Sequence, residues 1–407
     1  MKSLDQKLAE IKANASGGAF ILADAKDADM AFGARSPGPR SYLSARGARP
    51  AEFSPEVWSR DEFGYRNLPE FLDIIREVTR QGLIDILLMS AYVSEQLTIK
   101  EGLFRDSAVT PAARANDATD VWAVRHGCYT REPARPFRSA SIDHIQCGKI
   151  ECERDGEVPG ANLGLYSVTF TNDVERDRET LLAYKEFREE AERKGFRYFL
   201  EVFDPNAATG VPADKLGEFI NDKIARSLAG VTGAGRPLFL KIVYHGPRAM
   251  EELAQYDPNL VVGILGGGAG TTYDAFKLIH EAQKHGARAA LFGRKINHAE
   301  HQLAFIEMLR LITDGRISPE EAVRAYHGVL QGKGIRPKLP LEQDLVLTDP
   351  TLAHDGAGKA RSTVSIQAKP EPSPTWPVLG NGAPDFERMS SEQRRAYDRH
   401  RLTRKFG

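Results

Sequence analysis

The stretch GRPLFLKIVYHGP, residues 235–247, contains an apolar run of strand length that is interrupted by a single lysine, Lys241. The run is apolar at successive positions, without the alternation of a half-exposed strand. This pattern is typical of parallel sheets that helices cover. Lysine is almost never fully buried without a partner, because desolvation of an ammonium costs free energy and lowers its pKa. Lys241 is therefore a candidate nucleophilic amine.

Strand-like and helix-like segments alternate along the chain. The sequence predicts eight strands, at 19–24, 83–89, 107–111, 163–170, 197–203, 237–244, 260–265 and 288–293. The clearest helical patterns lie between them, at 69–81, 177–194, 213–228, 271–285 and 299–312. Eight such units favour a (β/α)₈ TIM barrel. An open doubly wound sheet would need a glycine-rich loop after the first strand, where this chain has LADAKDAD.

Three segments do not fit the repeat. Residues 25–68 and 111–162 are long insertions after strands one and three of the predicted barrel domain, residues 1–334. We expect both at the mouth of the barrel, either as a lid over an anionic substrate or as a disordered or oligomer-contacting excursion. Residues 335–407 form a proline-rich tail that ends in a basic helical pattern, SSEQRRAYDRHRL. The tail is predicted to contact another subunit of a homo-oligomer.

Composition excludes several classes of partner. Lys and Arg number 55 against 56 Asp and Glu, so nothing indicates nucleic acid or an anionic membrane surface. No apolar run reaches the roughly 20 residues of a membrane span. The N-terminal MKSLDQKLAEIKANASGG reads as a short amphipathic helix without the apolar centre of a secretory signal, so a cytoplasmic location is expected. The spacing of the three cysteines predicts reduced thiols.

The carboxyl ends of barrel strands converge on one pocket, so the polar residues there can be considered together. Three ionisable residues lie in or at the end of apolar strands: Asp24, Glu201 and Lys241. The loops after strands seven and eight are candidates for phosphate binding through backbone amides, a helix N-terminus and a guanidinium. Their residues are Gly266, Gly267, Gly268, Gly293 and Arg294, and Tyr244 and His245 are candidate pocket residues.

Each candidate also has a structural interpretation. Lys241 and Glu201 would form a buried ion pair, but such pairs give little net stability, which favours a functional role. Asp24 would cap the loop that follows it. His298 and His301 have the spacing of a helical ligand pair without a third ligand nearby, so the sequence predicts neither a metal nor another cofactor.

Four of these stretches carry a resemblance. YFLEVF, LFLKIVY, the glycine-rich turn after VVGIL, and HGARAALFGRKIN resemble the second half of the class I aldolases that include tagatose-bisphosphate aldolase, archaeal-type fructose-bisphosphate aldolase and the thiolase of autoinducer breakdown. The resemblance covers roughly residues 160–312, with FILADAKDAD a weaker match to the first strand. It implies a Schiff-base lysine at Lys241, an acid at Glu201, a general acid/base at Asp24, and phosphate contacts from Gly267, Gly268 and Arg294. The insertions and the tail depart from that family.

The sequence thus predicts a metal-independent class I aldolase or transaldolase acting on a phosphorylated ketose or a keto-sugar acid. An amine that condenses with a ketone gives an iminium, an electron sink that allows the adjacent carbon–carbon bond to break. An acyl-transferring thiolase or a β-keto acid decarboxylase would use the same lysine and phosphate site. A non-catalytic barrel with a structural Lys241–Glu201 pair is the alternative from a different class.

Overall fold

The computed structural model describes residues 1–13, 18–39, 65–117, 124, 127–128, 132–153, 158–267, 270–352, 376–379 and 384–406. Eight parallel strands close into a barrel in the order of the sequence, from β1 paired with β2 to β8 paired with β1. The strands are β1 Ile21–Lys26, β2 Ile86–Met89, β3 Thr110–Arg114, β4 Leu163–Thr169, β5 Arg197–Phe203, β6 Leu240–Ile242, β7 Gly263–Leu265 and β8 Ala289–Phe292. The predicted (β/α)₈ barrel is confirmed.

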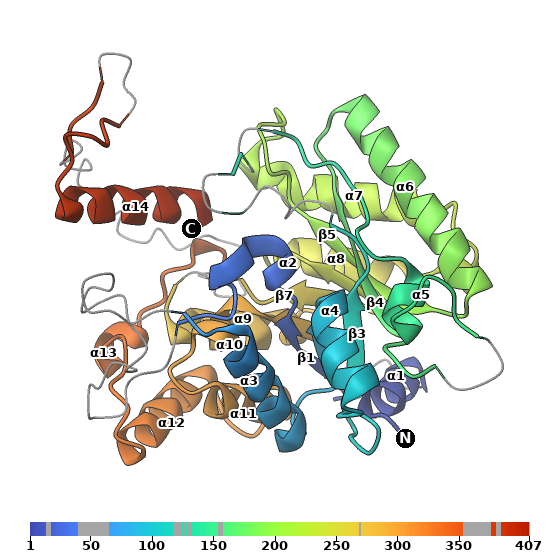
Figure 1. Cartoon of the computed structure of the whole chain (residues 1–407), viewed down its shortest axis with the longest axis horizontal. Helices are drawn as coiled ribbons and strands as arrows, with labels where there is room; N and C mark the ends of the chain where they lie inside the picture. The colour runs from blue at the N-terminus through green and yellow to red at the C-terminus, as the bar shows by residue number, and fades with distance from the viewer. Residues whose placement is uncertain are drawn as a thin grey trace.

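Helices cover the outside of the barrel (Figure 1). Those that follow strands include α3 Leu68–Gln81, α4 Ala91–Ser94, α5 Ile142–Cys147, α6 Val174–Arg193, α7 Leu216–Leu228, α8 Pro247–Tyr256, α9 Thr272–Lys284, α10 Arg294–His298 and α11 Gln302–Thr313. The others are α1 Ser3–Ala13, α2 Asp29–Phe32, α12 Pro319–Gly332, α13 Leu341–Asp344 and α14 Ser391–Phe406. No helix in the described part of the chain is long and apolar enough to cross a membrane.

Two apolar layers hold the barrel together. The inner layer is formed by alternate strand residues, such as Phe199 and Phe239, whose rings stack with centroids 4.6 Å apart. Leu4 and Leu8 of α1 join this inner cluster, so the amphipathic N-terminal helix covers one end of the barrel. The remaining strand residues face outward and pack against the surrounding helices. The site therefore lies at the other end, where the strands have their carboxyl ends.

Both insertions contact segments at the carboxyl ends of strands, as predicted, in their described parts. In the first insertion, the Arg66 guanidinium donates to the Asn297 carbonyl of α10 at 3.1 Å. In the second, the Ala134 amide donates to the Asn206 side chain, which follows β5, at 3.1 Å. Residues 40–64, which make up most of the first insertion, lie outside the described residues. The lid itself stays a prediction.

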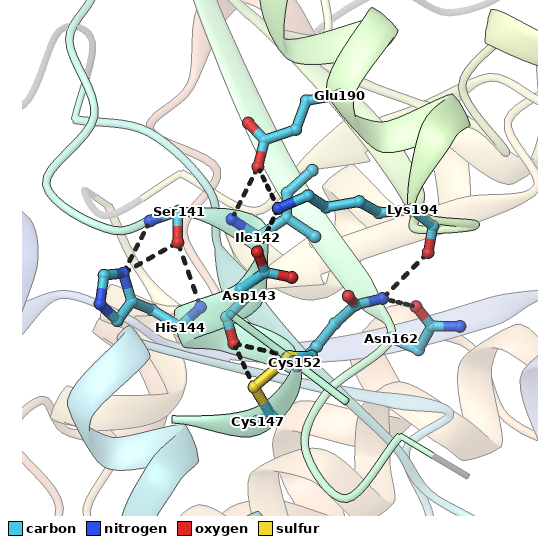
Figure 2. Close-up of a disulfide and its surroundings, with 10 residues drawn as sticks. Ser141, Ile142, Asp143, His144, Cys147, Cys152, Asn162, Glu190 and Lys194 are labelled. Atoms are coloured by element: carbon cyan, nitrogen blue, oxygen red, sulfur yellow. Dashed lines mark hydrogen bonds and ion pairs between the residues drawn. A yellow bond between two sulfur atoms is a disulfide. The ribbon is translucent and has the colours of Figure 1, made fainter. Parts of the chain in front are cut away.

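The prediction of reduced thiols was wrong for two of the three cysteines. Cys147 and Cys152 form a disulfide, with their Cα atoms 5.9 Å apart (Figure 2). Cys147 ends α5, and Gly148 takes a left-handed conformation there, which turns the chain back toward the helix. Figure 2 shows Lys194, the residue directly after α6, reaching Asp143 of α5, an ion pair that joins α5 to the end of α6. Because the chain reverses at Gly148, two cysteines only five positions apart can form the disulfide.

The tight contact between β7 and its neighbours generates a stability prediction. A Cβ atom at Gly263 would lie 2.6 Å from the Leu240 carbonyl oxygen and 2.8 Å from Ala289 Cβ. Gly263→Ala should therefore lower the free energy of unfolding by about 1–3 kcal/mol, the usual effect of overpacking. Gly230→Ala is the matched control, since nothing lies within 4 Å of its added Cβ. Equal urea unfolding curves for the two variants would contradict the packing described for β7.

Candidate active site

Lys241 and Glu201 meet inside the barrel. They occupy paired positions on β6 and β5 and both point inward, one layer above the stacked rings of Phe239 and Phe199. The Lys241 ammonium contacts the Glu201 carboxylate directly through Oε1. Lys241 is 7% exposed and Glu201 1% exposed, so both members of the pair are buried near the carboxyl ends of the strands. The two residues that the sequence places on neighbouring strands are thus brought together.

The second carboxylate oxygen of Glu201 has its own partners. Ser167 Oγ of β4 donates to Glu201 Oε2 at 2.8 Å, and Arg114 Nη2 of β3 lies 3.8 Å from the same oxygen. Arg114 Nε in turn donates to Asp27 Oδ2 at 2.7 Å. Charges alternate along Asp27, Arg114, Glu201 and Lys241. This alternation reduces the cost of burying four ionised groups together.

Arg114, Asp27 and Ser167 are residues that the sequence reasoning missed. Strand three was predicted to end at residue 111, whereas β3 continues to Arg114. Strand one was predicted to end at Asp24, whereas β1 continues to Lys26 and places Asp27 at the mouth. The signal that could have found Arg114 is a charged residue directly after the small apolar pair Ala112 and Ala113.

Asp24 does not join this cluster. By register it is level with Leu87 and Phe292, which both belong to the outer apolar layer. Its carboxylate pairs at 3.0 Å with Lys26, which points to the same side of β1. Burial raises the pKa of Asp24 and lowers that of Lys26, and the attraction between the two opposes both shifts. The geometry therefore separates Asp24 from Lys241 by the wall of the barrel.

Lys26 connects β1 with the helices after β8. Its ammonium donates to Asn297 Oδ1 at 2.5 Å and to Gln302 Oε1 at 2.8 Å, and the side chain is fully buried. All three partners of Lys26 are therefore oxygen atoms of polar side chains. This arrangement satisfies a buried ammonium and fixes α10 relative to the barrel.

Tyr244 and His245 differ in their position. Tyr244 packs into the outer apolar layer, where burial raises the pKa of its phenol. His245 Nε2 lies 3.0 Å from Asp204 Oδ1, and these residues follow β6 and β5 respectively. His245 is thus at the rim of the mouth, whereas the ring of Tyr244 is not.

The glycine turn after β7 is shaped by its neighbours. The Gly266 amide donates to the Leu291 carbonyl at 2.7 Å, and an added Cβ would collide with the ring of Phe292. Gly267 has φ of +59°, a conformation that favours glycine. Gly268 lies outside the described residues. Close packing and a left-handed residue explain why this turn is rich in glycine.

The loop after β8 carries positive charge. Gly293 packs against the backbone of Ala25, and Arg294 begins α10 with its guanidinium 5.8 Å from the centre of the Phe32 ring. Burial, together with the charges of Lys338 and Arg294, lowers the pKa of His298 in this helix to about 4. Positive side chains therefore lie near His298, whereas the carboxylates of Asp274, Asp344 and Glu300 act on Lys295 of the same helix.

The position of Asp24 leads to a prediction about stability. Asp24→Ala should lower the free energy of unfolding by about 3–5 kcal/mol, because it leaves the Lys26 charge buried without its counter-ion. The double variant Asp24→Leu with Lys26→Met, which removes both charges, should recover part of this loss. Urea unfolding measures both effects. Unchanged stability of Asp24→Ala together with loss of activity would instead support the acid/base role that the sequence resemblance implies.

Comparisons with known proteins place the fold. No protein-family model and no curated protein matches the sequence. An archaeal fructose 1,6-bisphosphate aldolase superposes with a TM-score of 0.50 on 76% of this chain and 99% of its own, at 12% identity. A Schiff base-forming fructose-1,6-bisphosphate aldolase has a TM-score of 0.49 over 76% of this chain and 100% of its own, at 14% identity. At such low identity the likeness concerns the fold: the chain shares the barrel of the archaeal aldolase, as the sequence resemblance predicted.

Proposed function

We propose that the protein is a class I aldolase or transaldolase that cleaves a phosphorylated ketose or a keto-sugar acid through a Schiff base on Lys241. The observation that carries the proposal is the contact between the Lys241 amine and Glu201 at the open end of the barrel. A buried ion pair contributes little net stability, so a structural role alone explains it poorly. The shared barrel with an archaeal aldolase is consistent with the proposal.

Glu201 is suited to the proton transfers of Schiff-base formation. Its Oε2 is held by Ser167 and Arg114, which leaves Oε1 directed at the amine. The Lys241 ammonium first passes one proton to Glu201, and the neutral amine adds to the ketone. A second proton moves from nitrogen to the former carbonyl oxygen, which gives a carbinolamine. Glu201 then returns its proton to this hydroxyl, so that water leaves and an iminium that keeps one N–H forms. Lys241 and Glu201 are already in contact, so these proton transfers need no rearrangement of β5 or β6.

Asp27 is the second carboxylate that faces the mouth, and we assign it the acid/base role in place of Asp24. Arg114 holds Asp27 and lies beside Glu201, so both carboxylates are in fixed positions. As the carbon–carbon bond breaks, the substrate hydroxyl loses its proton to Asp27 while the electron pair moves into the iminium. Cleavage then gives an aldehyde and an enamine on Lys241.

Covalent trapping tests the proposal. Borohydride reduction in the presence of a panel of phosphorylated ketoses should add one ketose to the wild-type protein, with the adduct mapped to Lys241 by peptide mass. Lys241→Met should trap nothing, and it should stay folded although less stable, because Arg114 still lies beside the Glu201 carboxylate as a counter-ion. The double variant Asp24→Leu with Lys26→Met, which removes a second barrel lysine together with its buried counter-ion, is the control and should still trap. A folded Lys241→Met variant that traps normally would remove the Schiff base.

The phosphate contact gives a separate prediction. Arg294→Ala should weaken binding of a phosphorylated substrate by roughly 10- to 150-fold, the range of a charge-assisted hydrogen bond, and spare its dephosphorylated analogue. Arg294→Lys should fall between wild type and alanine, because lysine keeps the charge but loses the planar fork. Steady-state kinetics on the matched substrates, beside a thermal melt, measures this. An equal penalty on both substrates would contradict the phosphate site.

A further inference from the structure

The first part of the C-terminal tail binds its own barrel at the loop after β7. Asp344, the last residue of α13, accepts a hydrogen bond from the Thr272 amide at 2.7 Å, at the N-terminus of α9. Its other oxygen lies 2.9 Å from Nε2 of His327 in α12. A carboxylate of the chain itself thus occupies the helix N-terminus that the sequence assigned to a phosphate.

Asp274 in the first turn of α9 makes the reverse contact: here a carboxylate of the helix accepts hydrogen bonds from the tail. It caps the helix by accepting from the Thr271 amide at 2.8 Å. Its Oδ1 also accepts from the amides of Thr348 at 2.8 Å and Asp349 at 3.1 Å, and its Oδ2 accepts from the Thr348 hydroxyl. Burial opposes ionisation of Asp274, but these hydrogen bonds lower its pKa. One carboxylate therefore joins the start of α9 to the tail.

The tail also contacts the helix after β8. The Lys338 amide donates to Glu300 Oε1 at 2.7 Å, and the Lys338 ammonium binds the carbonyl of His298 at the end of α10. Lys295 of α10 reaches across to the other loop and donates to the carbonyls of Gly270 and Thr271 at 2.6 and 2.9 Å. Residues 338–349 thus contact both loops that are candidates for phosphate binding.

The last glycine of the turn, Gly270, packs against the tail. Gly270 has φ of +79°, and an added Cβ would meet the Asp274 carboxylate and, at 3.0 Å, the Thr348 hydroxyl. The tail is therefore part of the wall against which the end of the turn packs. This contact differs from the predicted one, in which the tail meets another subunit.

We propose that residues 338–349 form a clamp that holds the loops after β7 and β8 in the shape needed for the substrate phosphate, with Asp344 as a positioning residue. The clamp acts on substrate affinity through the loops and leaves the Lys241 amine untouched, since none of its contacts involves the inner face of β6. The affinity part of this proposal rests on the proposed function.

Hydrogen exchange tests the clamp without reference to catalysis. In Asp344→Ala the amides of 266–273 should exchange roughly 2- to 30-fold faster than in wild type, the factor expected for loss of a capping carboxylate. Glu342→Ala is the matched control, because it removes the same charge from an exposed position of the same helix. Unchanged exchange in Asp344→Ala would overturn the clamp. Should that variant fail to fold, Asp344→Asn keeps an acceptor for Thr272 and should give a smaller effect in the same direction.

Borohydride trapping with dihydroxyacetone phosphate and with dihydroxyacetone tests the effect on affinity. Asp344→Ala should raise the concentration of the phosphorylated probe needed for half-maximal trapping by the same factor as the exchange rate, and leave dihydroxyacetone unchanged. Equal changes for both probes, or none, would overturn the positioning role. Wild-type protein that traps neither probe would refute the phosphorylated-ketose form of the proposed function, whereas the exchange result would still decide whether the clamp exists.

Discussion

The ion pair between Lys241 and Glu201 is the interaction on which the rest of the site depends. Two charges inside an apolar barrel are tolerated only when their remaining polar atoms are satisfied, because each loses its hydration on burial. Glu201 meets this requirement through Ser167 and Arg114, and Arg114 then requires Asp27. The strands β3, β4 and β5 therefore carry polar residues toward their carboxyl ends. The opposite end of the barrel is filled by apolar side chains.

The pleat of the strands separates two sets of buried charges. Asp27 belongs to the inner set, and Asp24 and Lys26 belong to an outer set that binds Asn297 and Gln302. The inner set lies at the carboxyl ends of the strands, where the proposed function places the substrate. The outer set is closed by helices and is suited to holding α10 in place. Asp24 and Asp27, only three positions apart, therefore lie on different sides of the barrel wall and have different roles.

The loops at the mouth combine charge with a carboxylate clamp. Glycines allow the turn after β7 to pack against Phe292, and Asp344 and Asp274 complete the hydrogen bonds of the first turn of α9. The first amides of α9 are thus bound by carboxylates of the chain, so the proposed phosphate contact depends mainly on Arg294 at the start of α10. Residues 338–349 of the tail thus pack on the barrel of their own chain. The expected contact of the tail with another subunit stays a prediction.

The sequence by itself determined the eight strands, their order and the proximity of Lys241 to Glu201, because strand ends in a parallel barrel converge by geometry. It did not determine which face Asp24 occupies, because a strand that is buried on both sides shows no alternation of polar and apolar residues. Arg114 was missed because β3 is short and lacks β-branched residues after Thr110. The Cys147–Cys152 bond depends on a left-handed glycine, and the docking of Asp344 depends on α9, 72 residues earlier in the chain. Contacts between segments so far apart in sequence arise only once the barrel has closed.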